Sequence, residues 1–349
     1  MVLDWLKHGG ASRRSRLNPI DEVCRMKSRL FALIFPLFPG LLLPAASATA
    51  QTYPTKPLRF VVSFTPGGSQ DVVARLFGQK VGEALGQQVV IENRSGAGGL
   101  ISAQIVARSN PDGHTLFLSN GAPLAIIPNL QPNVDYHPLK DFTHIIHLID
   151  LPLVVLVNAK LPATSIKELI AYSKANKGRV NTASTGNGTY THLTLELFKI
   201  ATGASLTHVP YKGAAPAFTD LLGGQIESMF TTTASAQPHL ASGRVRVLAV
   251  TTPKRASLMP NVPTMTESGF PGFEVSSWAG VSAPAGIPAA VARRLAVEFG
   301  KAMELPDTKA RLAGLGVEPS GATHEVFTKM IRDESERWAK VIKTAEIRP

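Results

Sequence analysis

Short apolar segments alternate with amphipathic segments from residue 58 onward, and this alternation limits the possible folds more than any other feature. Residues 58–64, 89–91 and 115–118 are rich in β-branched or other apolar residues and predict buried strands. Residues 71–85 and 96–108 lie between them and predict helices, the first with one apolar face. Strands and helices in this order favour a parallel sheet covered on both faces, which is an α/β fold.

The alternation continues through the rest of the chain. Further strands are predicted at residues 153–157, 180–183, 206–209 and 245–250, and further helices at 166–176, 189–201, 214–222, 234–241, 288–303 and 323–344. Ser165 and Glu168 form a capping box that opens one of these helices. A chain of 349 residues suits two domains. We expect residues 51–152 with 275–349 to form one lobe and 153–274 the other, joined by extended segments, with a ligand cleft between them.

The N-terminus has the pattern of a secretory signal peptide. Arg25, Lys27 and Arg29 precede an apolar run over residues 30–43, and a stretch of small residues ends at Ala50. The run is too short and too interrupted by proline to predict a membrane span. We expect cleavage near Ala50 and, because residues 1–25 are polar and unusually long for such a leader, a true start at Met26. We therefore interpret residues 1–50 as a signal peptide with an extension before Met26 and expect the protein in the periplasm.

Composition and charge exclude several classes of function. The formal charge is +11, of which residues 1–50 carry +4, and the basic residues of the remainder are dispersed and not clustered with aromatic residues. This distribution argues against nucleic-acid binding. The one cysteine, Cys24, precedes the expected cleavage point, which excludes disulfides and cysteine-based metal sites from the mature chain.

Two strand-to-helix loops carry the residues best suited to bind an anion. The first loop (residues 64–71) and the second loop (residues 184–192) each combine glycines with hydroxyl groups just before a predicted helix. Glycine lets backbone N–H groups approach a ligand closely, and a helix N-terminus favours negative charge. Each loop alone could be an ordinary turn, but together they could hold the two ends of a dicarboxylate. The candidate residues are Phe64, Thr65, Pro66, Gly67, Gly68, Ser69 and Asp71, and Ser184, Thr185, Gly186, Asn187, Gly188, Thr189 and His192.

Three further residues are candidates with open alternatives. Ser119 and Asn120 follow a predicted strand, and ligands of open parallel sheets lie beyond the carboxyl ends of the strands, although a turn would explain them equally well. Trp278 could line the cleft or belong to the core.

Motifs of known enzyme chemistry are scarce. The sequence contains no G-x-S-x-G, P-loop or H-E-x-x-H pattern. His192 and His208 could act as bases, but the sequence places no nucleophile beside them. His137, His144 and His147 lie close together but lack the ligand spacing of a metal site. We therefore expect no cofactor, no metal and no catalytic activity.

Short motifs occur in a fixed order from residue 53 to the C-terminus. These motifs are 53–57 (YPTKP), 66–68 (PGG), 92–99 (ENRSGAGG), 111–116 (PDGHTL), 209–213 (VPYKG), 243–250 (GRVRVLAV), 273–275 (FEV) with Trp278, 283–286 (APAG) and 316–319 (GVEP). In their order and spacing, they resemble the Bug or TctC-type receptors of tripartite tricarboxylate transporters.

The resemblance implies a two-lobed periplasmic-binding-protein fold, type II-like, that closes on its ligand like a hinge. It implies that the first loop holds one carboxylate with backbone groups and that the second loop, with His192 nearby, holds the other end. It also implies delivery of a di- or tricarboxylate or an aromatic carboxylate to inner-membrane permease subunits. We expect a monomer. A secreted hydrolase that uses His192 and a ligand sensor for a membrane kinase are the alternatives.

Two positions depart from the pattern of this family. Residues 230–233 lack the acidic residue that is frequent there, and Ala279 follows Trp278 where a larger residue is common. We expect both to reshape the distal end of the cleft. Hydroxyl groups at residues 231–233 would suit a neutral or carboxylate group better than an ammonium group.

Overall fold

The computed structural model describes residues 53–131, 133–344 and 346–347. The expected signal peptide, its cleavage near Ala50 and the start at Met26 lie outside these residues. Among the residues described, no helix combines the length and apolar character that a membrane crossing requires.

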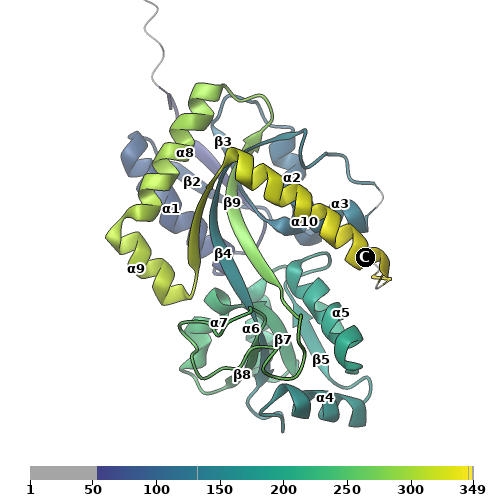
Figure 1. Ribbon diagram of the computed structural model, residues 1–349. Coiled ribbons are helices and arrows are strands. Elements are labelled where there is room, and N and C mark those ends of the chain that lie inside the picture. Colours follow the sequence, from purple (N-terminus) through teal and green to yellow (C-terminus); the bar gives the residue numbers. More distant parts are fainter. Residues whose placement is uncertain (1–52, 132, 345, 348–349) are drawn as a thin grey trace, which may run out of the picture. The chain divides into compact units, whose positions relative to one another are not determined.

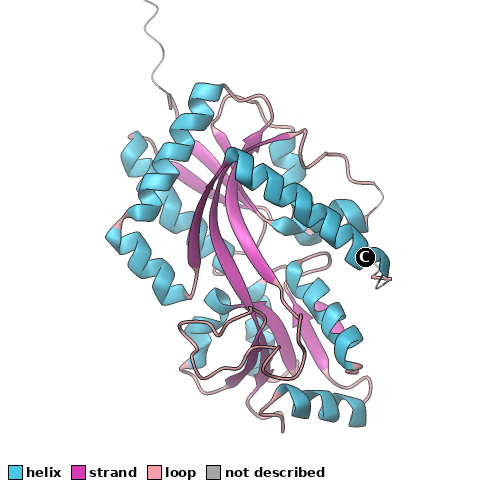
Figure 2. Cartoon of the chain, viewed as in Figure 1, coloured by secondary structure: helices cyan, strands magenta, loops and turns pink. Residues whose placement is uncertain are grey.

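The strands form one continuous sheet, in which two long strands run between two groups of shorter ones (Figures 1 and 2). The strands are β1 (Leu58–Val62), β2 (Val89–Asn93), β3 (Thr115–Ser119), β4 (Phe142–Asn158), β5 (Asn181–Ser184), β6 (Thr207–Pro210), β7 (Ser228–Thr232), β8 (Val245–Val250), β9 (Ser276–Pro284) and β10 (Glu318–Thr323).

Helices follow most of the strands and cover the faces of the sheet. The helices are α1 (Ser69–Leu85), η1 (Ala97–Gly99), α2 (Leu100–Ala107), η2 (Ala122–Ile126), α3 (Ile127–Leu130), α4 (Ile166–Ala175), α5 (Tyr190–Thr202), α6 (Ala214–Gly223), α7 (Thr233–Leu240), α8 (Ala289–Glu304), α9 (Pro306–Leu315) and α10 (His324–Thr344).

Strand β4 belongs to two groups of strands and thereby joins two lobes. The strand order is β2-β1-β3-β9-β4-β7-β5-β6, and β8 and β10 also pair with β4. Residues Phe142 to Pro152 of β4 pair with β9, whereas residues from Leu153 onward pair with β7 and β8. The first lobe therefore contains β1, β2, β3, β9, β10 and the first part of β4. The second lobe contains β5, β6, β7, β8 and the rest of β4.

The parallel pairing predicted from the alternating pattern is present in both lobes. Strand β1 lies parallel to β2 and β3, and β5 lies parallel to β6 and β7. Parallel strands end at the same edge of a sheet, so the loops that follow β1, β3, β5 and β7 gather where the lobes meet.

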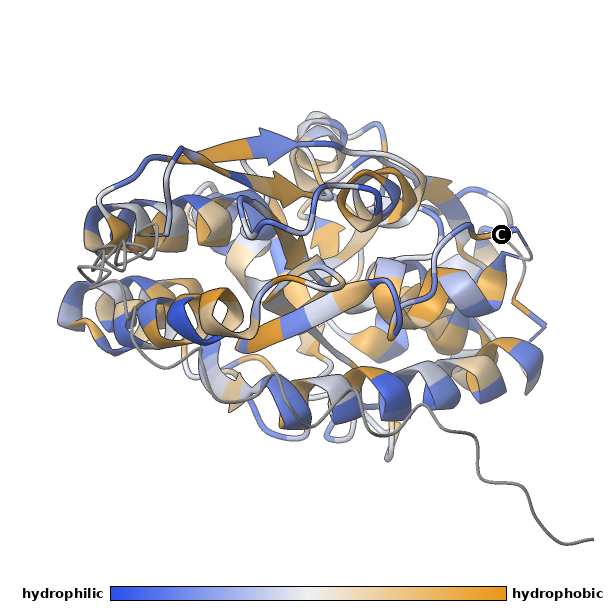
Figure 3. Cartoon of the chain, turned by 90° about the horizontal axis from the view of Figure 1, so that it is seen from above, coloured by the Kyte–Doolittle hydropathy of each residue, from blue (hydrophilic) through white to orange (hydrophobic). Residues whose placement is uncertain are grey.

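Each lobe has a core on both faces of its sheet, because successive side chains of a strand point to opposite faces. Phe60 of β1 packs against Phe299 of α8, while its neighbour Val61 joins the core on the other face. In the second lobe, Val154 and Val155 of β4 divide between two cores in the same way. Hydrophobic and hydrophilic residues lie side by side along the helices (Figure 3).

The predicted helices and strands agree with the structure where the apolar pattern is strong. The capping box is confirmed, since the Ser165 side chain accepts a hydrogen bond from the Glu168 N–H. The prediction missed α9, β7, β10 and the first part of β4. Polar residues at positions 144, 147 and 150 obscure the pattern of β4, and β10 has the sequence EPSGAT, which contains no large apolar residue.

Candidate ligand-binding site

The first loop leaves β1 and is held at its base by a buried carboxylate. Gly67 has a positive φ of 83°, and its N–H donates to Asp71 Oδ2 at 3.0 Å. Arg75 and Asn93 also donate to Asp71, at 2.9 and 3.1 Å. Burial opposes ionisation of this carboxyl, but the hydrogen bonds from Arg75, Gly67 and Asn93 outweigh it and lower the pKa of Asp71. The Asp71 side chain is therefore an ionised carboxylate, and it holds the first loop in place through these hydrogen bonds.

Helix α1 begins directly after this loop with N–H groups that have no partner within the helix. Its N-cap is Gly68, which offers no side chain to cap them. The N–H of Ser69 donates to the hydroxyl of Ser235, on α7, at 3.2 Å. The next two N–H groups, of Gln70 and Asp71, lack intrahelical acceptors because they lie in the first turn. Such N–H groups, with the positive end of the helix dipole, favour an anion.

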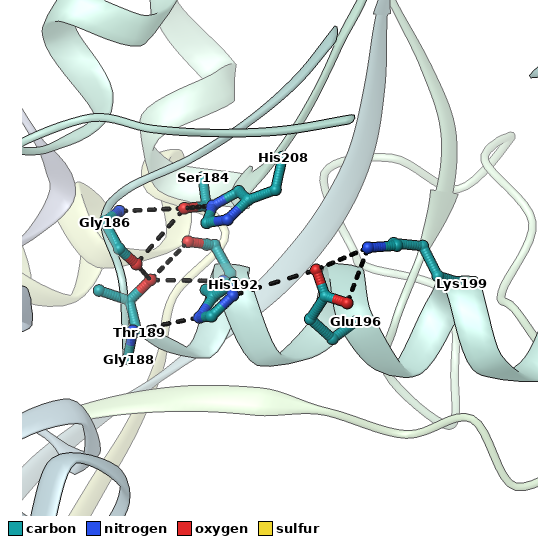
Figure 4. Close-up of polar contacts among 9 residues, drawn as sticks. Ser184, Gly186, Gly188, Thr189, His192, Glu196, Lys199 and His208 are labelled. Atoms are coloured by element: carbon teal, nitrogen blue, oxygen red, sulfur yellow. Dashed lines mark hydrogen bonds and ion pairs between the residues drawn. The ribbon is translucent and has the colours of Figure 1, made fainter. Parts of the chain in front are cut away.

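The second loop leaves β5 and is held by a histidine in place of a carboxylate (Figure 4). Gly188 has a φ of 69°, and its N–H donates to His192 Nδ1 at 3.2 Å. Thr189 is the N-cap of α5: its hydroxyl donates to the Gly186 carbonyl at 2.7 Å and accepts from the His192 N–H at 3.4 Å. Thr191 Oγ1 accepts from the Thr185 N–H at 2.8 Å. The loop is thus closed by its own side chains.

His192 stacks on His208 behind the loop. The ring centroids are 4.3 Å apart, and His208 Nε2 lies 2.6 Å from the hydroxyl of Ser184. Burial lowers the pKa of both His192 and His208 to about 4. Both rings are therefore neutral at neutral pH, which lets His192 Nδ1 accept the hydrogen bond from Gly188.

His192, Glu196 and His208 also offer one potential metal ligand each, all within 4.8 Å of one another. However, His192 Nδ1 accepts from Gly188, so in the neutral ring the proton sits on Nε2, the nitrogen nearest Glu196. Lys199 already pairs with Glu196 at 2.8 Å. A metal would have to displace this proton and this ammonium group. We therefore interpret the cluster as support for the second loop.

The two loops face each other across one cleft between the lobes. It is lined by Phe64, Gly68, Ser69, Gln70, Asn120, Ala122, Thr185, Thr189, Tyr190, Thr191, Ala214, Thr231, Thr232, Ser235 and Ser277. Each of these residues is uncharged. Helices α1, α5, α6 and α7 all present their N-terminal residues to this cleft. Four positive helix ends around an uncharged lining favour a negatively charged ligand.

Four buried polar atoms of the lining residues have no hydrogen-bond partner among the residues that the structure describes. They are Gln70 Oε1, Asn120 Nδ2, Tyr190 Oη and Thr231 Oγ1. These residues are only 6%, 2%, 3% and 0% exposed. Buried polar groups in proteins are nearly always paired, so orphaned groups around a cleft point to a bound molecule.

The lobes approach each other closely around the cleft. A methyl group at Gly98 of the first lobe would collide with the Asn187 carbonyl of the second, and one at Gly213 would collide with Thr65. Tyr190 of the second lobe inserts against Gly121 and packs its ring on Trp338 of α10. The space open to the centre of a water molecule in the cleft is about 40 Å³. The conformation is therefore a closed one.

The predicted site residues divide into three groups. Those that line the cleft are Phe64, Gly68, Ser69, Asn120, Thr185 and Thr189. Gly186 and Asn187 line an adjoining hollow with Lys212. The others support the loops or the core: Thr65, Pro66, Gly67, Asp71, Ser184, Gly188 and His192 belong to the loops behind the lining, and Ser119 donates to the Gly280 carbonyl inside the first lobe.

Of the two alternatives for Trp278 in strand β9, the structure agrees with the core position, and the expectation about Ala279 needs correction. Trp278 does not line the cleft; it is 3% exposed, packs on Phe327 and donates its indole N–H to Glu334. Ala279 is fully buried in the core of the first lobe and cannot reshape the cleft. Ser277 lines the cleft instead, because neighbouring residues of a strand point to opposite faces. The other departure from the family pattern does reach the cleft, through Thr231 and Thr232.

The sequence analysis missed several lining residues. Gln70, Tyr190 and Thr191 lie within the first and second loops as defined, in the first turns of the helices that these loops enter, but they were not among the candidate residues. Ala214, Ser235, Ala122 and Ser277 come from other turns and strands, and only the packing of the lobes brings them to the cleft.

The fold and the cleft together define a two-lobed solute-binding protein. The family model of the tripartite tricarboxylate transporter family receptor matches residues 73–347, and the chain belongs to this family. Protein BugT of Bordetella pertussis is 39% identical over 300 residues, which cover 86% of this chain and 92% of BugT.

Solved structures show the same fold. The R. palustris protein Rpa4515, solved with adipate, is 36% identical and has a TM-score of 0.82 over 85% of this chain and 99% of that one. MatC from Rhodopseudomonas palustris, solved with bound malate, is 32% identical and has a TM-score of 0.80 over 83% of this chain and all of that one.

Proposed function

We propose that this protein is a periplasmic receptor that captures a small carboxylate in its cleft and delivers it to the permease subunits of a tripartite tricarboxylate-type transporter. The observation that carries the proposal is the convergence of four helix N-termini on a cleft whose lining is uncharged. Such a cleft compensates a carboxylate by backbone N–H groups, without a cationic side chain. Similar proteins solved with adipate and with malate support the same class of ligand.

We propose further that the lobes close about the crossing strands. We propose residues 51–152 with 275–349 as one lobe and residues 153–274 as the other. The change of partners of β4 between Pro152 and Leu153 supports this division. Binding at residues of both lobes would favour the closed form, because a ligand shifts an equilibrium by its differential affinity for the two states. We propose a secreted monomer, cleaved near Ala50.

We propose no catalytic role for the histidines. The pair that most resembles a nucleophile and its base is Ser184 with His208, at 2.6 Å. Ser184 is fully buried, does not line the cleft, and accepts a hydrogen bond from the Gly186 N–H at 3.1 Å. This pair supports the second loop and cannot reach a ligand in the cleft.

A thermal-shift screen against carboxylates, amino acids and aromatic acids tests the function. A ligand at one hundred times its dissociation constant stabilises the folded state by about 2.7 kcal/mol, which raises the melting temperature measurably. The proposal predicts a carboxylate among the hits, recovered chemically unchanged after incubation. Hits confined to uncharged or cationic compounds, or conversion of the bound acid, would contradict it.

A further inference from the structure

Tyr190 belongs to the second lobe by its place in the chain, but its side chain packs in a core formed mainly by the first lobe. It is the first residue of α5, lines the cleft and is 3% exposed. Its ring meets the ring of Trp338 on α10 edge to face, with centroids 5.8 Å apart. Its hydroxyl fills the space beside Gly121 where a Cβ would lie. Separation of the lobes must therefore withdraw this side chain from the first lobe.

The tip of Tyr190 meets a group of first-lobe residues that includes a carboxylate. We call this group the receiving cluster, and it consists of Gly121, Trp278, Glu334, Arg337 and Trp338. The Glu334 side chain is only 10% exposed, accepts a hydrogen bond from the Trp278 indole N–H and pairs with Arg337 at 3.4 Å. Arg337 is 54% exposed and also lies 5.2 Å from the centre of the Trp338 ring, so it covers the cluster toward solvent.

Glu334 and the Tyr190 hydroxyl are a complementary acceptor and donor. Burial and the neighbouring Glu334 carboxylate raise the pKa of Tyr190, so the hydroxyl keeps its proton, and burial also raises the pKa of Glu334. The Tyr190 hydroxyl and the Trp338 indole N–H lie beside this carboxylate, and neither has another hydrogen-bond partner among the described residues. Donors around a buried carboxylate compensate its loss of water. Withdrawal of Tyr190 would let water reach both Glu334 and the Trp338 ring.

Two opposing effects act on this contact between the lobes. Burial of the Tyr190 ring against Trp338 favours the closed form, whereas removal of water from Glu334 opposes it. A ligand that contacts the start of α5 in the cleft can then decide the balance. We propose that Tyr190 is a positioning residue that holds the lobes closed over a bound ligand by inserting into the receiving cluster, an inference that rests on the proposed function.

Gly121 allows the insertion to be tested without changing a lining residue. Its φ of −68° and ψ of −20° are ordinary for alanine. An added Cβ, however, would lie 2.0 Å from the Tyr190 hydroxyl, and its three nearest atoms would all belong to Tyr190. Gly121→Ala therefore excludes Tyr190 without straining the first lobe. We expect calorimetry to show at least about ten-fold weaker binding of the tightest-binding acid among malate, succinate and adipate.

A double variant separates the exclusion of Tyr190 from any other effect at Gly121. The shorter side chain of Tyr190→Leu does not reach Gly121, and we expect this variant to bind the acid more weakly by itself. Adding Gly121→Ala to Tyr190→Leu should change the affinity by less than about two-fold, because the collision is gone. The control is Gly314→Ala, whose added methyl group would meet nothing within 4 Å and which should keep the full affinity.

Tryptophan fluorescence reports the insertion directly. The chain has three tryptophans, and Trp278 and Trp338 belong to the receiving cluster. All proteins in this experiment carry Trp5→Phe, so that only these two emit. We expect a saturating amount of the acid to shift the emission maximum to shorter wavelength, because Tyr190 shields Trp338 from water. The shift should be lost in Gly121→Ala, Tyr190→Leu and Trp338→Phe.

Equal losses of affinity from Gly121→Ala with and without Tyr190→Leu would overturn the role of Tyr190. Undiminished binding by Gly121→Ala, or a full emission shift in that variant, would overturn it as well. Each of these results leaves the carboxylate receptor standing. If neither these three acids nor any other carboxylate of the screen binds, the proposed function fails, and the role of Tyr190 fails with it.

Discussion

The first and second loops enter their helices by the same geometry but depend on different chemistry. Gly67 and Gly188 each precede the N-cap with positive φ, and each donates its N–H to the side chain four residues later. In the first loop that acceptor is the carboxylate of Asp71; in the second it is the neutral ring of His192. A charged acceptor forms stronger hydrogen bonds than a neutral one, and the two titrate in different pH ranges.

Removal of the charged acceptor, Asp71, should have the largest effect on stability and on ligand affinity. Asp71→Leu leaves the N–H of Gly67 and the side chains of Asn93 and Arg75 without their shared partner. We expect a loss of about 3 kcal/mol in the free energy of unfolding, measured by urea denaturation at pH 7.5, and at least about ten-fold weaker ligand binding. The control Glu83→Ala, an exposed carboxylate on the same helix, should change stability by about 0.5 kcal/mol or less.

The matched change in the second loop should cost less. His192→Leu removes the acceptor for Gly188 without removing a charge, so we expect a loss of about 1–2 kcal/mol in the same measurement. A loss equal to or greater than that of Asp71→Leu would contradict the distinction between the two loops.

The pH dependence of stability should separate the loops. His192 and His208 titrate near 4 in the folded protein and near 6.5 when unfolded, so between these values the unfolded chain binds protons that the folded protein does not. The contribution of these two histidines to the free energy of unfolding is therefore fully present above pH 6.5. It falls as the pH drops toward 4, by up to about 1.4 kcal/mol per pH unit for each histidine. His144, whose pKa burial also lowers to about 4, adds to this fall.

The first loop should lose its support only at lower pH. The pKa of Asp71 is lowered in the folded state, so its contribution is present above the unfolded value of about 3.9 and disappears as the pH falls below it. Urea denaturation from pH 7.5 to 3.5 should show a shallower slope for His192→Leu between 6.5 and 4 and an unchanged slope for Asp71→Leu there. Parallel curves for His192→Leu and the natural protein would refute this assignment.

Substitution of Gly67 or Gly188 by alanine should have the smallest effect on stability and on ligand affinity. An alanine at Gly67 or Gly188 must adopt a left-handed conformation, which costs about 1 kcal/mol in either loop. At Gly67 the added methyl group would lie 3.9 Å from Ala215, an ordinary contact, whereas at Gly188 it would lie 2.9 Å from Ile127 of the first lobe. We expect denaturation to show similar losses of stability for Gly67→Ala and Gly188→Ala. We expect calorimetry to show about three-fold weaker ligand binding for Gly188→Ala alone. Equal ligand affinities of the two variants would show that the contact with Ile127 does not oppose closure of the lobes.

Local patterns predicted the loops well, because a glycine-rich turn between an apolar strand and an amphipathic helix is encoded within about fifteen residues. The helix that follows the first loop was predicted from residue 71 and begins at Ser69. The opposite face of the cleft could not be predicted in this way. Ser235 and Ala122 reach the cleft only through the pairing of distant strands, and no local pattern reveals whether Ser277 or Trp278 faces it.

We propose that the first and second loops bind the same carboxylate-bearing ligand. A crystal structure of the protein with the tightest-binding acid from the screen would show whether both loops contact it. We predict a carboxylate oxygen within hydrogen-bonding distance of the N–H of Gln70 or Asp71, with the rest of the ligand in contact with Thr185, Thr189 or Thr191. An acid that contacts only one loop, or that binds outside the cleft, would contradict the claim.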